Sequence, residues 1–347
     1  MKIRQTFLAV ALCTCAAFAA DFNFSFIGTY SDKYTKEPEK ALFDGQLKYN
    51  TAHIIWEAGV APKGCGLLLT FQKPTAISKV VVVTAKPNPI AYTPERTEFQ
   101  AWDSEKQDWK EATVVNDVTG RWNDKAFVTG EPIKTEWQTD ATTEGLRIRM
   151  FGHAIWLTEI EVYDANGAKL TPEPIPTPNA NIKALAPYAQ GGGASVNISF
   201  YNEKQAYVGN PNPLGRKDRS MILFDLRGLL DKGSVSCATL ELCMDPMGII
   251  TTNMFALEVF ENSRSSLRNQ DLIASDAKPI RQFLFSSQTM RTMRVDVTEL
   301  VNGILAKGDG YLGFRLKDIT IEKVGNRQNK AEGLILKYQN CKMEIAQ

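Results

Sequence analysis

The chain has 347 residues, of which 44% are hydrophobic and 23% are charged, and its 40 Lys and Arg residues against 39 Asp and Glu residues give a formal net charge of +1. These values are typical of a globular protein and exclude a disordered, collagen-like or many-span membrane protein. At roughly 150 residues per domain, the length favours two domains. A polyphosphate backbone or an anionic bilayer needs clustered positive charge, so nucleic acid is not an expected partner.

Residues 1–20 have the pattern of a signal peptide. Lys2 and Arg4 precede an apolar run at 7–18, which is shorter than the roughly 20 residues that a membrane-spanning helix needs. Small residues at 17 and 19 meet the requirement of signal peptidase, with cleavage directly afterwards. The sequence therefore predicts an exported protein that is secreted, periplasmic or held at the cell surface, with no transmembrane segment in the mature chain.

Four cysteines remain after cleavage, too few to replace a hydrophobic core in a chain of this length. They show no CxxC spacing, so a zinc site is not expected. One or two disulfides are possible in an oxidising compartment, and buried free thiols fit the pattern equally well. Cys237 and Cys243 would stand roughly 20 Å apart in one extended strand, so the bridge we consider is Cys243 with Cys341. The fourth cysteine is Cys65.

Strand signals dominate residues 21–170, the predicted first domain. Four consecutive valines lie between Lys79 and Thr84, and the segments 146–150 and 159–163 alternate apolar with charged residues, as half-buried strands do. Clusters of Pro, Asn and Gly separate these strands without amphipathic helices between them. Several short strands in this arrangement predict a β-sandwich.

A proline-rich segment marks the boundary between the domains. Proline stands at every second position from Thr171 to Pro178, which favours an extended, semi-rigid polyproline conformation. We therefore place a linker at 171–180 and a second domain at 181–347.

The second domain shows further strand signals and one helix signal. The segment 296–299 has the arrangement of a capping box, apolar residues follow helical spacing from Val297 to Leu305, and the helix is expected to end at Gly308. The expected strands are 221–224, 238–242, 255–260 and 334–338. Neither half repeats the other, so the sequence predicts an all-β protein of two different β-sandwich domains.

The search for catalytic motifs is negative. The two histidines, His53 and His153, form no HExxH motif, and the chain has no Gly-x-Ser-x-Gly elbow, GxGxxG loop or phosphate loop. Two modules of sandwich size leave no room for a further catalytic domain. Glycoside hydrolases use a pair of carboxylates, and the distance between the two depends on the fold. The sequence therefore leaves glycoside hydrolysis open. We expect a binding protein rather than an enzyme.

Five segments of residues 40–164 carry motifs in a recognisable order. They are an opening loop at 41–45, a strand pair at 70–80, a hairpin at 99–104 followed by Trp109, and closing strands at 146–150 and 157–163. Together they resemble the discoidin or coagulation-factor type C domain, which overlaps with the galactose-binding-like carbohydrate-binding modules. The resemblance implies a jelly-roll sandwich that presents ligand-binding loops at one end and carries a structural calcium ion.

We expect the first domain to carry the main sugar site, because several of its aromatic and histidine residues stand in loops among polar neighbours. His53 and Trp56 follow the opening loop, where sugar-binding members place an aromatic residue or a histidine against the ring. Lys86 stands where many members have an arginine, and it lacks the bidentate fork of that side chain. Three further residues, which can donate to hydroxyl groups or stack on a sugar, complete the expected set: Arg121, Trp122 and Trp156.

Each of these aromatic residues also has a packing alternative, because most aromatic side chains of a sandwich belong to its core. Trp122 and Trp156 can serve either role. Trp102 and Trp109, which flank the hairpin, are expected to be packing residues.

The expected calcium ligands come from both ends of the first domain. Calcium binds six to eight oxygen atoms, and the resemblance implies Asp44 and Thr51 in the opening segment and Glu159 in a closing strand. The alternative is that Asp44 caps a turn while Glu159 faces solvent together with Glu161.

Residues 182–338 carry a second series of motifs, at 219–226, 235–242, 293–301 and 313–316. This series resembles the bacterial DNRLRE family, some members of which are carbohydrate-binding modules with an expected jelly-roll fold. Asp225 and Asp296 recur in the family pattern, and we interpret both as caps or turn anchors.

The combined expectation is an exported, non-catalytic protein that binds a polysaccharide or glycan. Two alternatives remain. The chain can be a structural or adhesive protein that contacts other proteins at the cell surface, or an accessory component of a glycan-degrading system.

Overall fold

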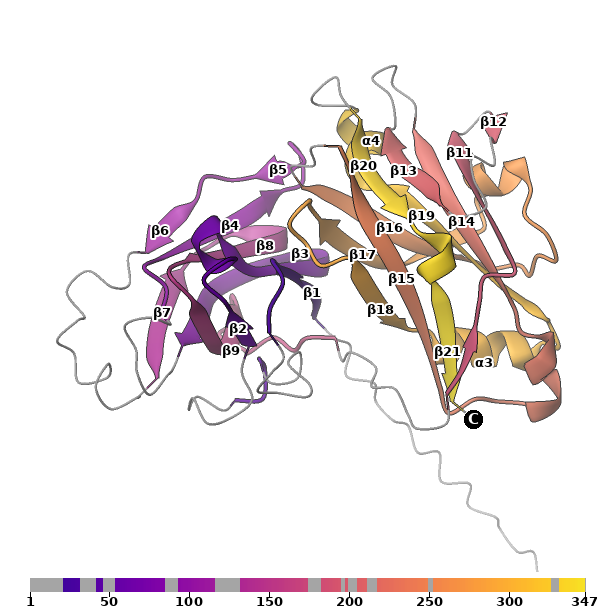
Figure 1. The fold of residues 1–347 in the computed structure, drawn as a ribbon, viewed down its shortest axis with the longest axis horizontal. Helices are drawn as coiled ribbons and strands as arrows, with labels where there is room; N and C mark the ends of the chain where they lie inside the picture. The colour runs from indigo at the N-terminus through magenta and orange to yellow at the C-terminus, as the bar shows by residue number, and fades with distance from the viewer. Residues whose placement is uncertain are drawn as a thin grey trace, which may run out of the picture.

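The computed structural model arranges the chain as two β-sandwiches that lie side by side (Figure 1). The predicted all-β class is thereby confirmed. In the described part of the chain, no helix is long and apolar enough to cross a membrane. The predicted signal peptide lies outside the residues that the structure describes, which are 21–31, 42–45, 54–84, 93–115, 132–173, 182–194, 197–198, 205–210, 217–248, 252–325 and 331–346.

The first sandwich is built from short strands, as the sequence predicts. Its described elements are β1 (Phe22–Ile27), β2 (Ile54–Trp56), a 3-10 helix η1 (Ala61–Lys63), β3 (Cys65–Thr84), β4 (Arg96–Asp103), β5 (Asp108–Trp109), β6 (Thr113–Val115), β7 (Ile133–Gln138), β8 (Thr142–Phe151) and β9 (Ile155–Asp164).

Two sheets of this sandwich share the long strand β3. The first half of β3, up to Phe71, pairs with β1 and β8, and β4 continues that sheet. The second half, from Ile77, pairs with β9 and β7. Between the halves, residues 72–74 are exposed, and Pro74 has no N–H group to leave unpaired there. β3 therefore joins the two layers of the sandwich.

The core of the first sandwich follows from the alternation of its strands. In β8, Leu146, Ile148 and Met150 are buried, whereas Arg147 and Arg149 lie on the outer face. The predicted half-buried strand is confirmed. Each such fully buried apolar side chain contributes roughly 1.5–3 kcal/mol to folding.

The second sandwich contains more strands and short helices. Its described elements are β10 (Ile182–Leu185), β11 (Ala189–Ala194), β12 (Asn197–Ile198), β13 (Ala206–Asn210), β14 (Asp218–Asp225), η3 (Arg227–Lys232), β15 (Cys237–Gly248), β16 (Asn253–Phe260), η4 (Asn269–Ile273), β17 (Ala277–Phe285), β18 (Thr292–Asp296), α3 (Thr298–Ala306), β19 (Tyr311–Asp318), α4 (Ile319–Val324), β20 (Glu332–Leu336), η5 (Tyr338–Asn340) and β21 (Lys342–Ala346).

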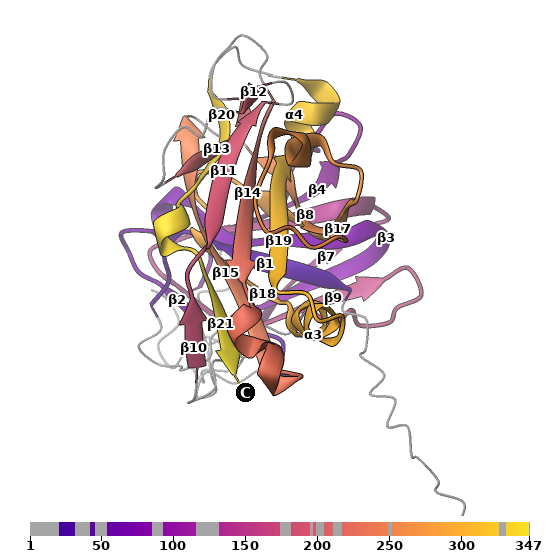
Figure 2. The same cartoon turned by 90° about the vertical axis from the view of Figure 1, so that its right-hand side faces the viewer.

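In the second sandwich, as in the first, one strand is shared between two sheets (Figure 2). The first half of β15 pairs with β18 and β21, and its second half pairs with β20. From β20 the sheet continues through β13, β14, β19 and β16 to β17. The core between the layers contains large side chains such as Phe224, Phe255 and Phe314.

The predicted helix is confirmed as α3, but the predicted capping box at 296–299 is wrong, because the N-cap residue is Val297 and it makes no side-chain cap hydrogen bond. The helix begins two residues after Asp296, whose Oδ1 accepts a hydrogen bond from the Thr298 N–H at 2.9 Å. Asp225 accepts in the same way from the Arg227 N–H at 3.0 Å. The interpretation of both aspartates as turn anchors agrees with these bonds. The predicted strand at 334–338 ends earlier than expected, because Tyr338 belongs to η5.

The four described cysteines are free thiols. Cys243 and Cys341 are nevertheless neighbours, since the Cys243 N–H donates to Cys341 Sγ at 3.4 Å. Burial raises the pKa of the Cys341 thiol to about 12. Their proximity agrees with the pair considered for a bridge, although no bond joins them.

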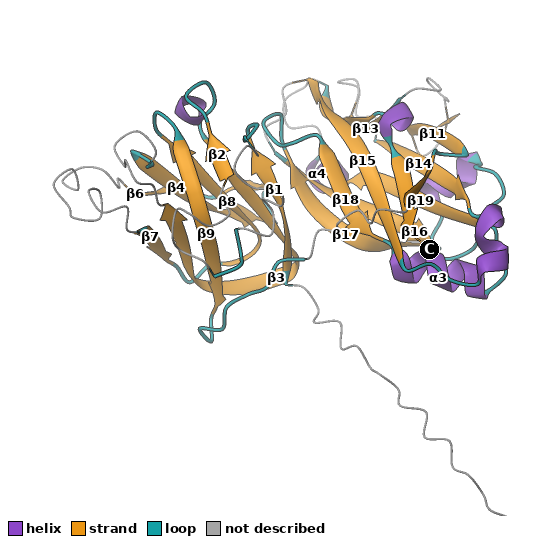
Figure 3. Ribbon diagram, turned by 60° about the horizontal axis from the view of Figure 1, so that its bottom comes forward, coloured by secondary structure: helices purple, strands orange, loops and turns teal. Residues whose placement is uncertain are grey.

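The two sandwiches dock directly against each other (Figure 3), with β17 beside β3 and β1. The Leu284 N–H donates to Thr70 Oγ1 at 3.0 Å, and Asn23 Nδ2 donates to the Gln282 carbonyl at 2.8 Å. The start of the predicted linker also belongs to the first sandwich, because Pro172 forms a parallel bridge with Phe22 of β1. The two sandwiches are therefore in direct contact.

A small apolar cluster fills this interface. Trp102 of the first sandwich packs with Leu284 and Met254 of the second, and all three are at most 1% exposed. Trp109 donates from Nε1 to Thr252 Oγ1 at 3.0 Å. The prediction that Trp102 and Trp109 are packing residues agrees with this placement, but they pack between the sandwiches rather than inside the first one.

Candidate functional site

One end of the first sandwich brings together several strand ends, and we call it the β8–β9 end. Strand β8 stops at Phe151 and β9 begins at Ile155, so the chain turns here. β4 begins opposite Phe151, and β3 ends at Thr84, which pairs with Ile133 at the start of β7. The antiparallel pairing thus gathers ends of both sheets at one place.

Several predicted ligand residues lie in segments that connect to this end. Residues 85–92 follow the end of β3, and residues 116–131 lie between β6 and β7. These segments contain Lys86, Arg121 and Trp122, which lie outside the described residues, as do His53 and Thr51.

An aromatic ring in contact with two guanidinium groups is the main feature of this end. The Arg96 guanidinium lies 4.0 Å from the centroid of the Phe151 ring, and the Arg149 guanidinium lies 4.8 Å from it. Glu98 forms ion pairs with both arginines, at 3.2 Å to Arg96 and 3.7 Å to Arg149. We call these four residues the arginine–phenylalanine cluster.

Strand register explains why the cluster forms. Arg96 stands opposite Phe151, and Glu98 stands opposite Arg149, in the antiparallel pairing of β4 with β8. Residues directly opposite each other in such a pair have neighbouring side chains on one face. Because Ile148 and Met150 point into the core, the side chains of Arg149 and Phe151 point outwards.

The cluster carries hydrogen-bonding capacity that the described residues do not use. Arg149 Nη2 donates to the Lys63 carbonyl at 3.4 Å, whereas its buried Nε has no hydrogen-bond partner among the described residues. The Arg96 side chain is 45% exposed. Beside them, His153 is exposed in the turn between β8 and β9. This end of the sandwich can therefore offer several donors and the exposed part of one aromatic ring to a ligand.

Sequence reasoning missed Arg96, Arg149 and Phe151 as site residues. The alternation of residues 146–150 already placed two arginines on an exposed face. The partner strand that supplies Arg96 lies about fifty residues away in the chain, and no local pattern identifies it.

The two predicted tryptophans that the structure describes have different environments. Trp56 is 0% exposed and belongs to the core, where its Nε1 donates to the Gly28 carbonyl at 3.3 Å. Its ring has no face available to a sugar, so the stacking role expected for Trp56 is wrong. Trp156 is partly exposed on β9 and pairs with Ile55. Its role as a ligand contact stays a prediction.

The predicted association of Glu159 with the opening segment is present. The Ile160 N–H donates to the Leu42 carbonyl at 2.8 Å, and the Gly45 N–H donates to Glu159 Oε2 at 3.1 Å. Glu159 is 0% exposed, so the alternative in which it faces solvent is wrong. The reason is that this segment and Lys169 cover it.

The cation at Glu159 is an ammonium group. Lys169 Nζ lies 3.0 Å from Glu159 Oε1 and 3.5 Å from Glu161 Oε1. Burial raises the pKa of Glu159 to about 7, and it does so against the hydrogen bonds from Lys169 and Gly45, which lower it. The carboxylate thus depends on these two donors for its charge.

These contacts bear on the predicted calcium site. Both oxygens of Glu159 already accept hydrogen bonds, one of them from a cation, and a calcium ion requires free oxygen ligands. Asp44 is exposed. In the described part of the chain, no group of three His, Cys, Asp or Glu side chains is arranged to hold a metal ion. Thr51 lies outside the described residues, and the calcium ion stays a prediction.

Comparisons with known proteins give structural similarities only. No family model matches the chain, and no curated protein matches it. One similar structure is a carbohydrate-binding module, CBM32-1, from a family 31 glycoside hydrolase of Clostridium perfringens. It has 14% identity and a TM-score of 0.28, and the match covers 41% of this chain and 94% of that one.

Two further similar structures come from other organisms. The fucolectin of striped bass, Morone saxatilis, has 8% identity and a TM-score of 0.31, over 94% of this chain and 97% of that one. Discoidin II of Dictyostelium discoideum has 8% identity and a TM-score of 0.29, over 91% of this chain and 95% of that one.

Proposed function

We propose that the chain is an exported, non-catalytic carbohydrate-binding protein whose main site is the β8–β9 end of the first sandwich. The observation that carries this proposal is the arginine–phenylalanine cluster, in which a partly exposed ring contacts two guanidinium groups. The lack of recognisable catalytic motifs in the sequence supports a binding role.

The chemistry of the cluster suits a sugar. A sugar ring presents C–H groups on one face and hydroxyl groups around its rim, so it needs an apolar platform with a few well-placed polar groups. Phe151 supplies an apolar surface. Arg96 and Arg149 supply planar donor groups that can bond two oxygens at once. Glu98 holds both arginines in place.

The predicted loop residues extend this surface in the proposal. Trp156 lies on β9, the strand that begins at the same end. His53, Lys86, Arg121 and Trp122 stay predictions, as does a calcium ion in the first domain. They would add stacking surface and donors beside the cluster.

The second sandwich offers a further aromatic surface. Tyr188 is 52% exposed, its ring lies 5.5 Å from that of Tyr311, and the Arg227 guanidinium lies 5.0 Å from the Tyr311 ring. This arrangement supports a second sugar contact, in line with the DNRLRE resemblance. The ligand we propose is therefore an extended polysaccharide or glycan. The alternatives remain an adhesive protein of the cell surface and an accessory component of a glycan-degrading system.

A glycan array probed with the mature chain tests the proposal. Phe151→Ala should abolish or strongly weaken binding, because the exposed apolar surface of the ring is lost. Val324→Ala, at a side chain that is 41% exposed in the second sandwich, should leave binding unchanged. Tyr188→Ala tests whether the aromatic surface of the second sandwich contributes to glycan binding. Binding that survives Phe151→Ala and is lost in Tyr188→Ala would move the main site to the second sandwich. The absence of any glycan binding by the wild-type chain would refute the proposed function.

A further inference from the structure

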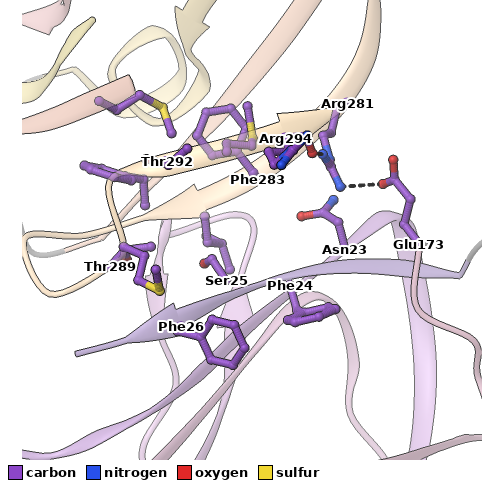
Figure 4. A pocket seen from close by; sticks show the side chains of 15 residues that line it. Asn23, Phe24, Ser25, Phe26, Glu173, Arg281, Phe283, Thr289, Thr292 and Arg294 are labelled. Atoms are coloured by element: carbon purple, nitrogen blue, oxygen red, sulfur yellow. Dashed lines mark hydrogen bonds and ion pairs between the residues drawn. The ribbon is translucent and has the colours of Figure 1, made fainter. Parts of the chain in front are cut away.

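A pocket of about 160 Å³ lies between the two sandwiches (Figure 4), and we call it the interdomain pocket. β1 forms one side of it, and β17 and β18 form the other. It is separate from the arginine–phenylalanine cluster, since none of the four cluster residues lines it. A cavity of similar size, about 150 Å³ with apolar walls, accepts a benzene ring in other proteins. The interdomain pocket is therefore large enough for one ring-sized molecule.

The walls of the pocket are mostly apolar. They include aromatic rings from both sandwiches, such as Phe26 and Phe283, and the flexible side chains of Met244, Met290 and Met293. Methionine side chains adapt to the shape of a ligand and make favourable contacts with aromatic rings. These walls suit an apolar or aromatic body.

One end of the pocket is polar. Figure 4 shows Asn23, Glu173 and Arg281 together at this end. Arg281 is 6% exposed, and it donates from Nη2 to Glu173 Oε2 and from Nη1 to the Arg294 carbonyl, both at 2.7 Å. Its buried Nε has no hydrogen-bond partner among the described residues. A buried donor without an acceptor costs about 1–3 kcal/mol, so a ligand oxygen that accepts from Arg281 Nε would stabilise the complex.

The free edge of β1 adds backbone groups to the pocket. At one end of this edge the Glu173 N–H donates to the Phe22 carbonyl at 2.7 Å, and at the other the Met290 N–H donates to the Phe26 carbonyl at 3.0 Å. Alternate residues of a strand direct their backbone groups to the same edge. The N–H and C=O of Phe24 therefore face this edge as well, and Phe24 lines the pocket. No strand or bridge of the described residues pairs with Phe24 there.

The charges around the pocket are balanced. Arg281 pairs with Glu173, and Arg294 pairs with Glu344 at 2.6 Å. A charged ligand would therefore bring an uncompensated charge into a largely buried site. A neutral ligand is favoured.

From these four features we propose that the interdomain pocket binds a small neutral molecule with a secondary amide and an apolar ring. The amide complements the N–H and C=O of Phe24 as a neighbouring strand would, with its own C=O and N–H. The ring lies among the phenylalanine and methionine side chains. The carbonyl oxygen or a second oxygen of the ligand accepts from Arg281 Nε.

N-methylbenzamide, which has a secondary amide and an aromatic ring, is the probe. Two related compounds test the contributions of the amide and the ring separately. Methyl benzoate keeps the ring and carbonyl but lacks the N–H donor, and toluene keeps the ring alone. Ligand-observed NMR and calorimetry with the mature chain should show binding of N-methylbenzamide. Methyl benzoate should bind about tenfold more weakly, since one hydrogen bond is lost, and toluene more weakly still.

Two pocket variants test the location. Ser25→Leu and Thr292→Phe each place a larger side chain in the pocket, and either variant that retains the wild-type melting behaviour should lose N-methylbenzamide binding. Ser266→Leu, at an exposed position outside the pocket, should bind as the wild type does. The proposal is overturned if the wild-type chain binds no probe at millimolar concentration, which would leave water as the occupant. It is also overturned if methyl benzoate binds equally well, or if a folded pocket variant still binds the amide.

Discussion

The substitution Lys169→Met would leave the buried carboxylate of Glu159 without its ammonium partner. The Lys169 Nζ and Glu159 Oε1 atoms are 3.0 Å apart, and the two side chains are 37% and 0% exposed. Removing one partner of a fully buried pair costs about 3–5 kcal/mol, whereas exposed pairs contribute about 0.2–1 kcal/mol. Because Lys169 reaches water, we expect a loss of about 2 kcal/mol in the free energy of unfolding near neutral pH.

This loss should depend on pH, in a direction set by Glu159. Its pKa is raised by burial to about 7 in the folded state, from an ordinary value of 4.5. The folded state therefore binds the Glu159 proton more tightly than the unfolded state does. As the pH rises from 4.5 to 7, ionisation of Glu159 lowers the free energy of unfolding by about 3 kcal/mol in total. Without Lys169 the pKa of Glu159 rises further, so the loss continues above that range.

Urea unfolding of the mature chain at acidic, neutral and mildly alkaline pH measures both effects. In Lys169→Met the stability should fall most steeply on the alkaline side. The double variant Glu159→Gln with Lys169→Met lacks the titrating group, so it should be more stable than Lys169→Met at alkaline pH. Equal stability of Lys169→Met and wild type at alkaline pH would refute this reasoning. Added calcium that stabilises the wild type but not the double variant would show that a metal ion, rather than the lysine, serves Glu159.

Three further predictions concern stability and oxidation. Under oxidising conditions, peptide mapping without reduction should recover a disulfide between Cys243 and Cys341, because the Cys243 N–H lies 3.4 Å from Cys341 Sγ; recovery of both as free alkylated thiols would contradict this. Leu284→Ala should cost about 2–5 kcal/mol and lower the melting temperature, since Leu284 is 1% exposed at the interface between the sandwiches; an unchanged melting curve would show that the interface contributes little. Gly66→Ala should destabilise the first sandwich by at least about 2 kcal/mol, because Gly66 has φ 147° and a Cβ there would collide with the Ile148 carbonyl; a purified variant with wild-type stability would contradict it.

Local sequence patterns determined the class of fold. The alternation of residues 146–150 and the valines at 80–83 predict strands that the structure contains as parts of β8 and β3. The apolar spacing from Val297 to Leu305 predicts α3. These signals depend on neighbours within a few residues, where the period of the chain decides which side chains share a face. The same patterns cannot specify which strands pair.

Tertiary structure decided the roles of individual side chains. Trp56 follows the opening segment as a ligand residue would, but the packing of β2 on β9 buries it completely. Glu159 alternates with apolar neighbours as an exposed residue would, yet the segment around Gly45 and the side chain of Lys169 enclose it. Burial of this kind depends on what lies on the far side of the sheet, and the sequence of one strand does not contain that information.

The candidate site also combines features that follow from local sequence with features that depend on tertiary contacts. The sequence alone determined that Arg147 and Arg149 share one face of a strand, that Asp296 anchors the start of a helix, and that the chain contains two unlike all-β modules. Only the tertiary structure decided that Arg96 lies against Phe151 and that β17 docks on β1 and β3. The physical reason is that such contacts join residues far apart in the chain, through strand register and the docking of whole sheets, and neither leaves a periodic signal in the local sequence.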